Sequence, residues 1–250
     1  MAGRPAPNTR WPGRGGRPPG ARPQVGGRPG PARVLRFDAT QRAAHWLTAL
    51  LFLILMATGL ALFLPSIAVL VGRRELVARI HLWTGVVLPV ALAATLIGPW
   101  GAAMRRDLRR IDLWTKDELR WLRSLGTDRP PVVDKFNPGQ KLNAIFVGSA
   151  VIVMLASGAV LQWFGLFPLG WRTGATFVHD LVALMVFVVV LGHVLFALTH
   201  RDALRAMIFG WVTEPWARRH APGWLREIEA SAGRPPPGAT VREDAGGDGA

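Results

Sequence analysis

The sequence predicts an all-α membrane protein, a bundle of four transmembrane helices with both termini in the cytoplasm. Half of its 250 residues are hydrophobic, and they gather in four long blocks instead of being dispersed as in a soluble core. The basic residues gather between these blocks, which is typical of a topology signal. Histidines lie within the blocks, and an ionisable side chain in a membrane helix indicates a functional site.

Each apolar block has about the twenty residues that a helix needs to cross a bilayer. The first block is preceded by Asp38 and Thr40, either of which is a candidate helix cap, and it ends at Pro65. The four predicted spans are approximately residues 43–64, 80–97, 142–164 and 174–199.

The rest of the chain is polar. Residues 1–32 are rich in Arg, Pro and Gly and lack the apolar core of a signal peptide, so we predict a disordered tail. Residues 33–230 form the predicted helical domain, and residues 231–250 a second disordered tail. Within the central loop, residues 114–125 are interpreted as an amphipathic helix that lies on the membrane surface or docks a partner.

The distribution of basic residues sets the orientation. Arg and Lys number 9 in the segment through Arg42, 10 from Arg105 through Lys141 and 7 from Arg201 onward. The two remaining connections share 4. Because cytoplasmic segments carry the excess of basic residues, we expect both termini and the central loop in the cytoplasm and the two short connections outside.

Composition also excludes some classes of protein and cofactor. The net charge of +14 would suit a nucleic-acid partner. The basic residues form no reading surface, however, so we expect membrane lipid and no nucleic acid around the chain. The absence of cysteine excludes disulfides, iron–sulfur ligation and covalently attached c-type haem in this chain.

Four histidines fall at two predicted depths. His179 and His193 share the fourth span and are fourteen residues apart. On a helix this spacing separates them by about 21 Å along the axis and about 40° around it. With the predicted topology, His45 lies at the inner level with His193, and His81 lies at the outer level with His179.

Two histidines at one depth on facing helices are what a bis-histidine haem requires, so the pattern predicts two b haems. Two other interpretations stay open. A lone histidine at a helix end is also typical of the membrane interface, and a haem-free transporter or membrane scaffold would use histidines as proton relays. Near the histidines, Gly59, Gly85 and Gly192 would allow a flat ring to approach, although glycine is common in membrane helices.

Four segments carry a resemblance to a known family. They read RFDATQRAAHW from Arg36, RIHLWTG from Arg79, KFNPGQKLN from Lys135 and MIFGWVTEPWARRHAPGWLREIE from Met207. The chain resembles the γ subunit of membrane-bound, quinone-linked formate dehydrogenase, a four-helix cytochrome b. The histidine pattern is also shared with cytochrome b subunits of membrane hydrogenases and other quinone-linked oxidoreductases, and the last segment favours formate dehydrogenase.

The resemblance implies a role for individual residues. His81 and His179 would ligate the iron of an outer haem, and His45 and His193 that of an inner one. Further cofactor-binding residues are implied for a quinone pocket near His193, namely Asn137, Gly139 and Gln140. From the residues alone, Asn137-Pro138-Gly139 is a turn that begins a helix.

The resemblance further implies an electron-transfer subunit of anaerobic respiration in the bacterial cytoplasmic (inner) membrane. It would carry no catalytic residue and would pass electrons through two b haems to a quinone, either menaquinone or ubiquinone. Its expected partners are an iron–sulfur subunit and a molybdopterin or tungsten catalytic subunit, on which formate would be oxidised.

Overall fold

The computed structural model describes residues 32–124 and 132–233. The predicted disordered tails therefore lie almost entirely outside the described residues. The elements are, in chain order, β1 (Arg33–Leu35), α1 (Ala39–Phe63), α2 (Pro65–Val71), α3 (Arg74–Ala94), α4 (Ala102–Asp112), α5 (Lys116–Arg123), α6 (Pro138–Gln162), the 3-10 turn η1 (Phe164–Leu166), α7 (Leu169–Thr199), α8 (Arg201–Phe209), β2 (Trp211–Thr213), α9 (Glu214–His220) and α10 (Pro222–Ser231).

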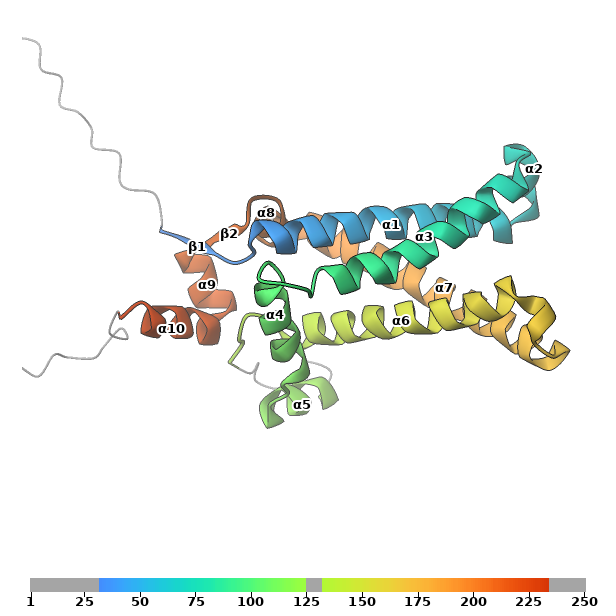
Figure 1. Cartoon of the computed structure of the whole chain (residues 1–250). Helices are drawn as coiled ribbons and strands as arrows, with labels where there is room; N and C mark the ends of the chain where they lie inside the picture. Colours follow the sequence, from blue (N-terminus) through green and yellow to red (C-terminus); the bar gives the residue numbers. More distant parts are fainter. Residues whose placement is uncertain (1–31, 125–131, 234–250) are drawn as a thin grey trace, which may run out of the picture. The chain divides into compact units, whose positions relative to one another are not determined.

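Among the described residues, α1, α3, α6 and α7 are long and apolar enough to cross a membrane by length and composition. They have 25, 21, 25 and 31 residues. The predicted helical membrane fold with four spans is confirmed. As Figure 1 shows, α1 and α3 are joined through the short helix α2, and α6 and α7 form a second hairpin.

Each long helix begins several residues before the predicted span, because polar first turns are helical although they are not apolar. Asp38 caps α1 in a capping box with Gln41, an arrangement that contributes about 1 kcal/mol. His45 therefore lies in the second turn, not the first as we expected. The helix α3 begins at Arg74, so His81, expected at its start, lies two turns inside it.

The long helices pack in pairs and expose most of their apolar surface. In Figure 1, α1 runs beside α3 and α6 beside α7, and α3 also contacts α6. Leu51, Leu88 and Val151 form a buried cluster where α1, α3 and α6 meet. Large side chains such as Ile152, which is 70% exposed, point outward. Such a surface is suited to lipid contact, since helices in a bilayer gain nothing by hiding apolar groups from lipid.

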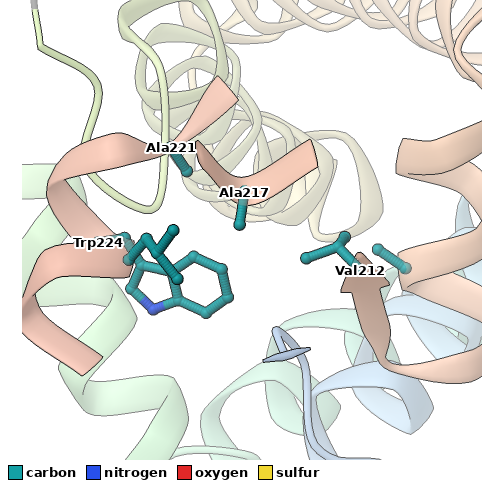
Figure 2. Packing of buried hydrophobic residues seen from close by; sticks show 6 residues of the cluster. Val212, Ala217, Ala221 and Trp224 are labelled. Atoms are coloured by element: carbon teal, nitrogen blue, oxygen red, sulfur yellow. The ribbon is translucent and has the colours of Figure 1, made fainter. Parts of the chain in front are cut away.

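A second core lies outside the long helices, in a unit that we call the ribbon module (β1, β2, α8, α9 and α10). The strands β1 and β2 pair antiparallel, with Val34 opposite Val212. This small sheet was not expected in an all-α chain. Figure 2 shows Trp224 lying near Ala217 of α9 and near Ala221, the residue between α9 and α10, with Val212 on the strand β2. The remaining members of the buried cluster are Ala206 and Leu225.

Gly210 joins the ribbon module to the start of α1. Its φ of 88° is in the left-handed region, and a Cβ there would lie 2.6 Å from the Phe37 carbonyl oxygen. Only glycine fits both conditions. Its own carbonyl accepts hydrogen bonds from the backbone N–H groups of Arg36 and Phe37. The segment just before α1 is therefore bonded to the segment that follows α7 and α8.

The central loop contains two helices. The predicted amphipathic helix is present as α5, capped by Thr115 in a capping box with Glu118. The helix α4 was not predicted because its sequence is mostly charged. It is held by tertiary contacts: Asp107 is buried, and Arg105 donates to the backbone carbonyl of Gly98 at 2.9 Å.

Candidate functional site

The helix α7 carries both His179 and His193 in one unbroken stretch. The fourteen-residue spacing is therefore a helical spacing, as predicted. The two rings lie at different levels, and each meets a histidine from another helix. His45 is supplied by α1 and His81 by α3, so three of the four long helices contribute to the arrangement.

The two histidine pairs have nearly equal dimensions. The ring centres of His45 and His193 are 6.2 Å apart, with an interplanar angle of 57°. Those of His81 and His179 are 6.3 Å apart, at 64°. The structure thus brings together the four histidines in the two combinations that the sequence predicts. Their role as metal ligands stays a prediction.

The separation within each pair suits one metal ion between two imidazoles. A metal–nitrogen bond of about 2.0–2.1 Å, extended by about 1.1 Å from nitrogen to ring centre, places opposed ring centres about 6.2–6.4 Å apart. The separations of 6.2 Å and 6.3 Å lie within this range. Two imidazole rings at this separation would suit the two histidine ligands of a b-type haem iron.

Small residues flank the His81–His179 pair. A Cβ added at Gly59 of α1 would lie 3.3 Å from Cε1 of His81, and one at Gly158 of α6 would lie 3.5 Å from Cε1 of His179. Of the other candidate glycines, Gly85 approaches only Leu55, and nothing lies within 4 Å of a Cβ at Gly192. Of the three glycines expected near the histidines, only Gly59 therefore lies close to an imidazole. Gly158, which was not among them, lies close to another.

Two hydroxyl groups beside these glycines touch the same imidazoles. Thr58 Oγ1 lies 2.9 Å from Nδ1 of His81, and Ser157 Oγ lies 2.9 Å from Nδ1 of His179. The sequence analysis missed both contacts. A signal for them was present in the Thr-Gly and Ser-Gly pairs inside apolar spans, but only the tertiary structure shows which histidine each pair faces.

The predicted quinone residues form the first turn of α6. Asn137 Oδ1 accepts from the backbone N–H of Gln140 at 2.8 Å, and Gln140 Oε1 accepts from that of Asn137 at 3.1 Å. The turn-and-helix interpretation of this segment is thus seen directly. Gly139 is exposed. In the described part of the chain, neither side-chain NH₂ group has an acceptor, and neither residue is hydrogen-bonded to His193.

A buried group of charges surrounds Asp107 near the amino-terminal end of α1. Lys135 Nζ lies 2.6 Å from Asp107 Oδ2, and both side chains are under a tenth exposed. Gln41, one turn before His45 on the same face of α1, also donates to Asp107. Arg36 is 5% exposed and donates to the Lys135 carbonyl at 2.9 Å. The first residues of α1 and α6 are therefore tied to α4.

Two basic side chains share one acidic side chain in this group. Burial lowers the pKa of Arg36 to about 10, although the nearby Asp107 opposes the shift. Burial also lowers the pKa of Lys135, again against the attraction of Asp107. The guanidinium of Arg36 remains protonated at neutral pH, and its Nε has no hydrogen-bond partner among the described residues.

Three further ion pairs fix the helices of the central loop. Lys141 Nζ lies 2.7 Å from Glu118 Oε1, with both side chains 4% exposed, and joins α5 to α6. Arg110 of α4 donates to Asp134 at 2.8 Å and to Glu227 of α10 at 2.7 Å. Hydrogen bonding to Glu227 and Asp134 raises the pKa of Arg110. Charged residues that the sequence analysis counted only as topology signals therefore also anchor this end of the bundle.

Comparison with known proteins assigns the chain to a family. A model of the family described as prokaryotic cytochrome b561 matches residues 36–210. The cytochrome b556 subunit of formate dehydrogenase from Haemophilus influenzae is 29% identical over 205 residues, which are 78% of this chain and 83% of that protein. The cytochrome b556(fdo) subunit of formate dehydrogenase from Escherichia coli K12 is 27% identical over 210 residues, 78% of this chain and 93% of that protein.

A nitrate-inducible relative from Escherichia coli K12, the cytochrome b556(Fdn) subunit of formate dehydrogenase, is 24% identical over 208 residues. The match to the family model covers more than half of the chain and includes all four paired histidines. The chain therefore belongs to the prokaryotic cytochrome b561 family, whose members are membrane proteins that bind haem b.

Proposed function

We propose that this member of the prokaryotic cytochrome b561 family is the membrane anchor and electron-transfer subunit of a respiratory formate dehydrogenase, carries two b haems and delivers electrons to a quinone. The observation that carries the proposal is the pair of matched histidine sites, 6.2 Å and 6.3 Å between ring centres, with one ligand of each on α7. The names of the relatives support the assignment to formate dehydrogenase.

The histidines would hold the two haems at different depths. His81 and His179 would provide the axial nitrogens of the outer haem, and His45 and His193 those of the inner haem. When bound, each haem supplies an iron that takes up and gives back one electron. The protein contributes the separation, about 21 Å along α7, and it places Gly59 and Gly158 where the outer ring would need space.

The inner end would face the cytoplasm, as the excess of basic residues favours. Quinone reduction is proposed at the start of α6. The capping box uses the side-chain oxygens of Asn137 and Gln140 and leaves their NH₂ groups to donate to a quinone carbonyl. Gly139 leaves the backbone between them accessible. Protons taken from the cytoplasm at this end, with electrons arriving from outside, would generate a transmembrane potential.

The partners are proposed from the resemblance and from the relatives' names. An iron–sulfur subunit would deliver electrons at the outer side. A molybdopterin or tungsten subunit would oxidise formate, so the enzyme activity belongs to the complex and formate oxidation would take place on another chain.

Haem analysis of the purified native complex tests this function. A pyridine haemochrome assay is expected to give two b haems per copy of this chain, and mass spectrometry of co-purifying chains is expected to find a formate dehydrogenase catalytic subunit. A colourless preparation would favour a haem-free transporter or scaffold. If a hydrogenase large subunit co-purifies instead, the chain would have the same electron-transfer role, but as a subunit of a hydrogenase complex.

A further inference from the structure

We propose that Thr58 and Ser157 are positioning residues that fix the protonation of the outer histidine pair and lower the midpoint potential of the haem it holds. The proposal rests on the function proposed above, namely haem ligation by His81 and His179. It concerns two hydroxyl groups on α1 and α6 that the family's histidine pattern does not include.

The hydroxyl of Thr58 lies between a backbone carbonyl and an imidazole. Thr58 Oγ1 is 2.7 Å from the carbonyl oxygen of Ile54, one turn earlier in α1. It is 2.9 Å from Nδ1 of His81 on α3. A hydroxyl has one proton to donate, and a carbonyl oxygen can only accept. We assign this proton to the carbonyl oxygen of Ile54, the shorter of the two contacts, so that the imidazole Nδ1–H of His81 donates to Thr58 Oγ1.

Ser157 repeats this arrangement on another helix. Ser157 Oγ is 2.8 Å from the carbonyl oxygen of Val153 and 2.9 Å from Nδ1 of His179 on α7. With the hydroxyl proton of Ser157 likewise assigned to the Val153 carbonyl, Nδ1–H of His179 is the donor to Ser157 Oγ. In both helices the hydroxyl residue directly precedes the glycine at which an added Cβ would lie against Cε1 of the same imidazole. Two unrelated stretches of sequence thus treat the two outer histidines alike.

The consequence for each imidazole follows from its tautomer. A neutral imidazole with its proton on Nδ1 has a free electron pair on Nε2, the nitrogen that a haem iron would take. A ligating histidine normally donates its other N–H to an acceptor, which fixes the ring orientation and raises the basicity of the ligand. A more basic axial ligand stabilises the ferric state more than the ferrous state, so it lowers the midpoint potential.

The inner pair lacks this support. In the part of the chain that the structure describes, the rings of His45 and His193 have no hydrogen-bond partner. The two hydroxyl contacts therefore act on the outer pair only. Because they lower the potential of the outer haem, they favour an order of potentials with the outer below the inner, and this order favours electron transfer from the outer side to the inner side.

The test compares isosteric variants in the purified complex. Ser157→Ala and Thr58→Val each remove one hydroxyl, whereas Ser157→Thr and Thr58→Ser retain it. Thr176→Val is the matched control, because Thr176 donates to a carbonyl one turn earlier and has no hydrogen bond to a histidine among the described residues. The readouts are the haem-to-protein ratio, potentiometric titration of both haems, and the low-spin electron paramagnetic resonance signal of each haem. Loss of one signal in His81→Ala identifies the outer haem.

We expect the midpoint potential of the outer haem to rise in Ser157→Ala and in Thr58→Val, with a larger rise in the double variant and an altered largest g value. Ser157→Thr, Thr58→Ser and Thr176→Val should retain the wild-type values, and the inner haem should serve as an unchanged reference.

Two results would overturn the proposal: an unchanged outer potential in variants that retain both haems, or loss of the outer haem that Ser157→Thr and Thr58→Ser share with the variants that lack the hydroxyl. Loss of the outer haem only where the hydroxyl is missing supports it. Absence of haem from the wild-type complex would instead contradict the proposed function, so the two failures are distinguishable.

Discussion

Lys135 of the loop before α6 and Asp107 of α4 form an ion pair of 2.6 Å with both side chains under a tenth exposed. Removing the charge of Asp107 would leave Lys135 and Arg36 as buried cations without a counter-charge. We expect Asp107→Asn to destabilise the protein by about 3–5 kcal/mol, which would be seen as a lower midpoint of thermal unfolding in detergent.

The matched control for this prediction is Glu75→Gln. Glu75 pairs with Arg79 at 3.2 Å, but the side chains are 86% and 65% exposed, and such surface pairs contribute about 0–1 kcal/mol. Adding Lys135→Met to Asp107→Asn should recover part of the stability by removing one unpaired cation. Equal thermal midpoints for Asp107→Asn and Glu75→Gln would show that the buried pair contributes no more than an exposed one.

Histidine double variants test the pairing itself. If the proposed ligation holds, His45→Ala and His193→Ala should each reduce haem content from two to one per chain, because each would remove a proposed ligand of the inner haem. Combining them should still leave one haem, since both belong to the same site. Combining His45→Ala with His179→Ala should leave none. Haemochrome assays would measure this, and complete loss in the His45/His193 double variant would contradict the assignment.

The glycines beside the outer pair give a steric prediction. Gly158→Ala should be tolerated, since its Cβ would make an ordinary contact 3.5 Å from His179. Gly158→Leu should displace the imidazole and remove the outer haem. The control is Gly148→Leu in the same helix, where nothing lies within 4 Å of an added Cβ. If both leucine variants bind two haems, the space beside His179 is not required.

The absence of cysteine allows a direct test of topology. Ser66→Cys lies in the exposed part of α2, and Ser231→Cys lies exposed at the end of α10. Both changes are close to isosteric. In intact spheroplasts, we expect a membrane-impermeant maleimide to label Cys at position 66 and not at position 231. After lysis both should be labelled. Labelling in the reverse order would invert the proposed orientation, and with it the inner and outer assignments.

The sequence sufficed to predict the four long helices and which histidines lie side by side, because both follow from helix length and helix geometry. A block of apolar residues must form a helix in a bilayer, and helix geometry then relates His179 to His193. The helix ends were less well predicted. The turns around Arg74 and Gln41 are polar, so hydropathy does not count them although the backbone there is helical.

The parts that the sequence did not predict depend on contacts between distant segments. The helix α4 is mostly charged, and it is stabilised by the pairing of Asp107 with Lys135. The strands of the ribbon module have three residues each and are held by a partner far along the chain. The hydroxyls of Thr58 and Ser157 looked like ordinary polar residues of membrane helices until the fold showed which imidazole each one faces.

Because α7 is unbroken, it also sets the fraction of the membrane voltage that lies between the levels of His179 and His193. Its two histidines are about 21 Å apart on the axis, against about 30 Å for the hydrocarbon thickness of a bilayer. An electron that moves from the level of one to the level of the other crosses roughly two-thirds of the insulating layer. The membrane voltage then opposes or assists that movement by about 1.6 kcal/mol per 100 mV. The number of residues between His179 and His193 thus sets how strongly the membrane voltage would change the free energy of electron transfer between their levels.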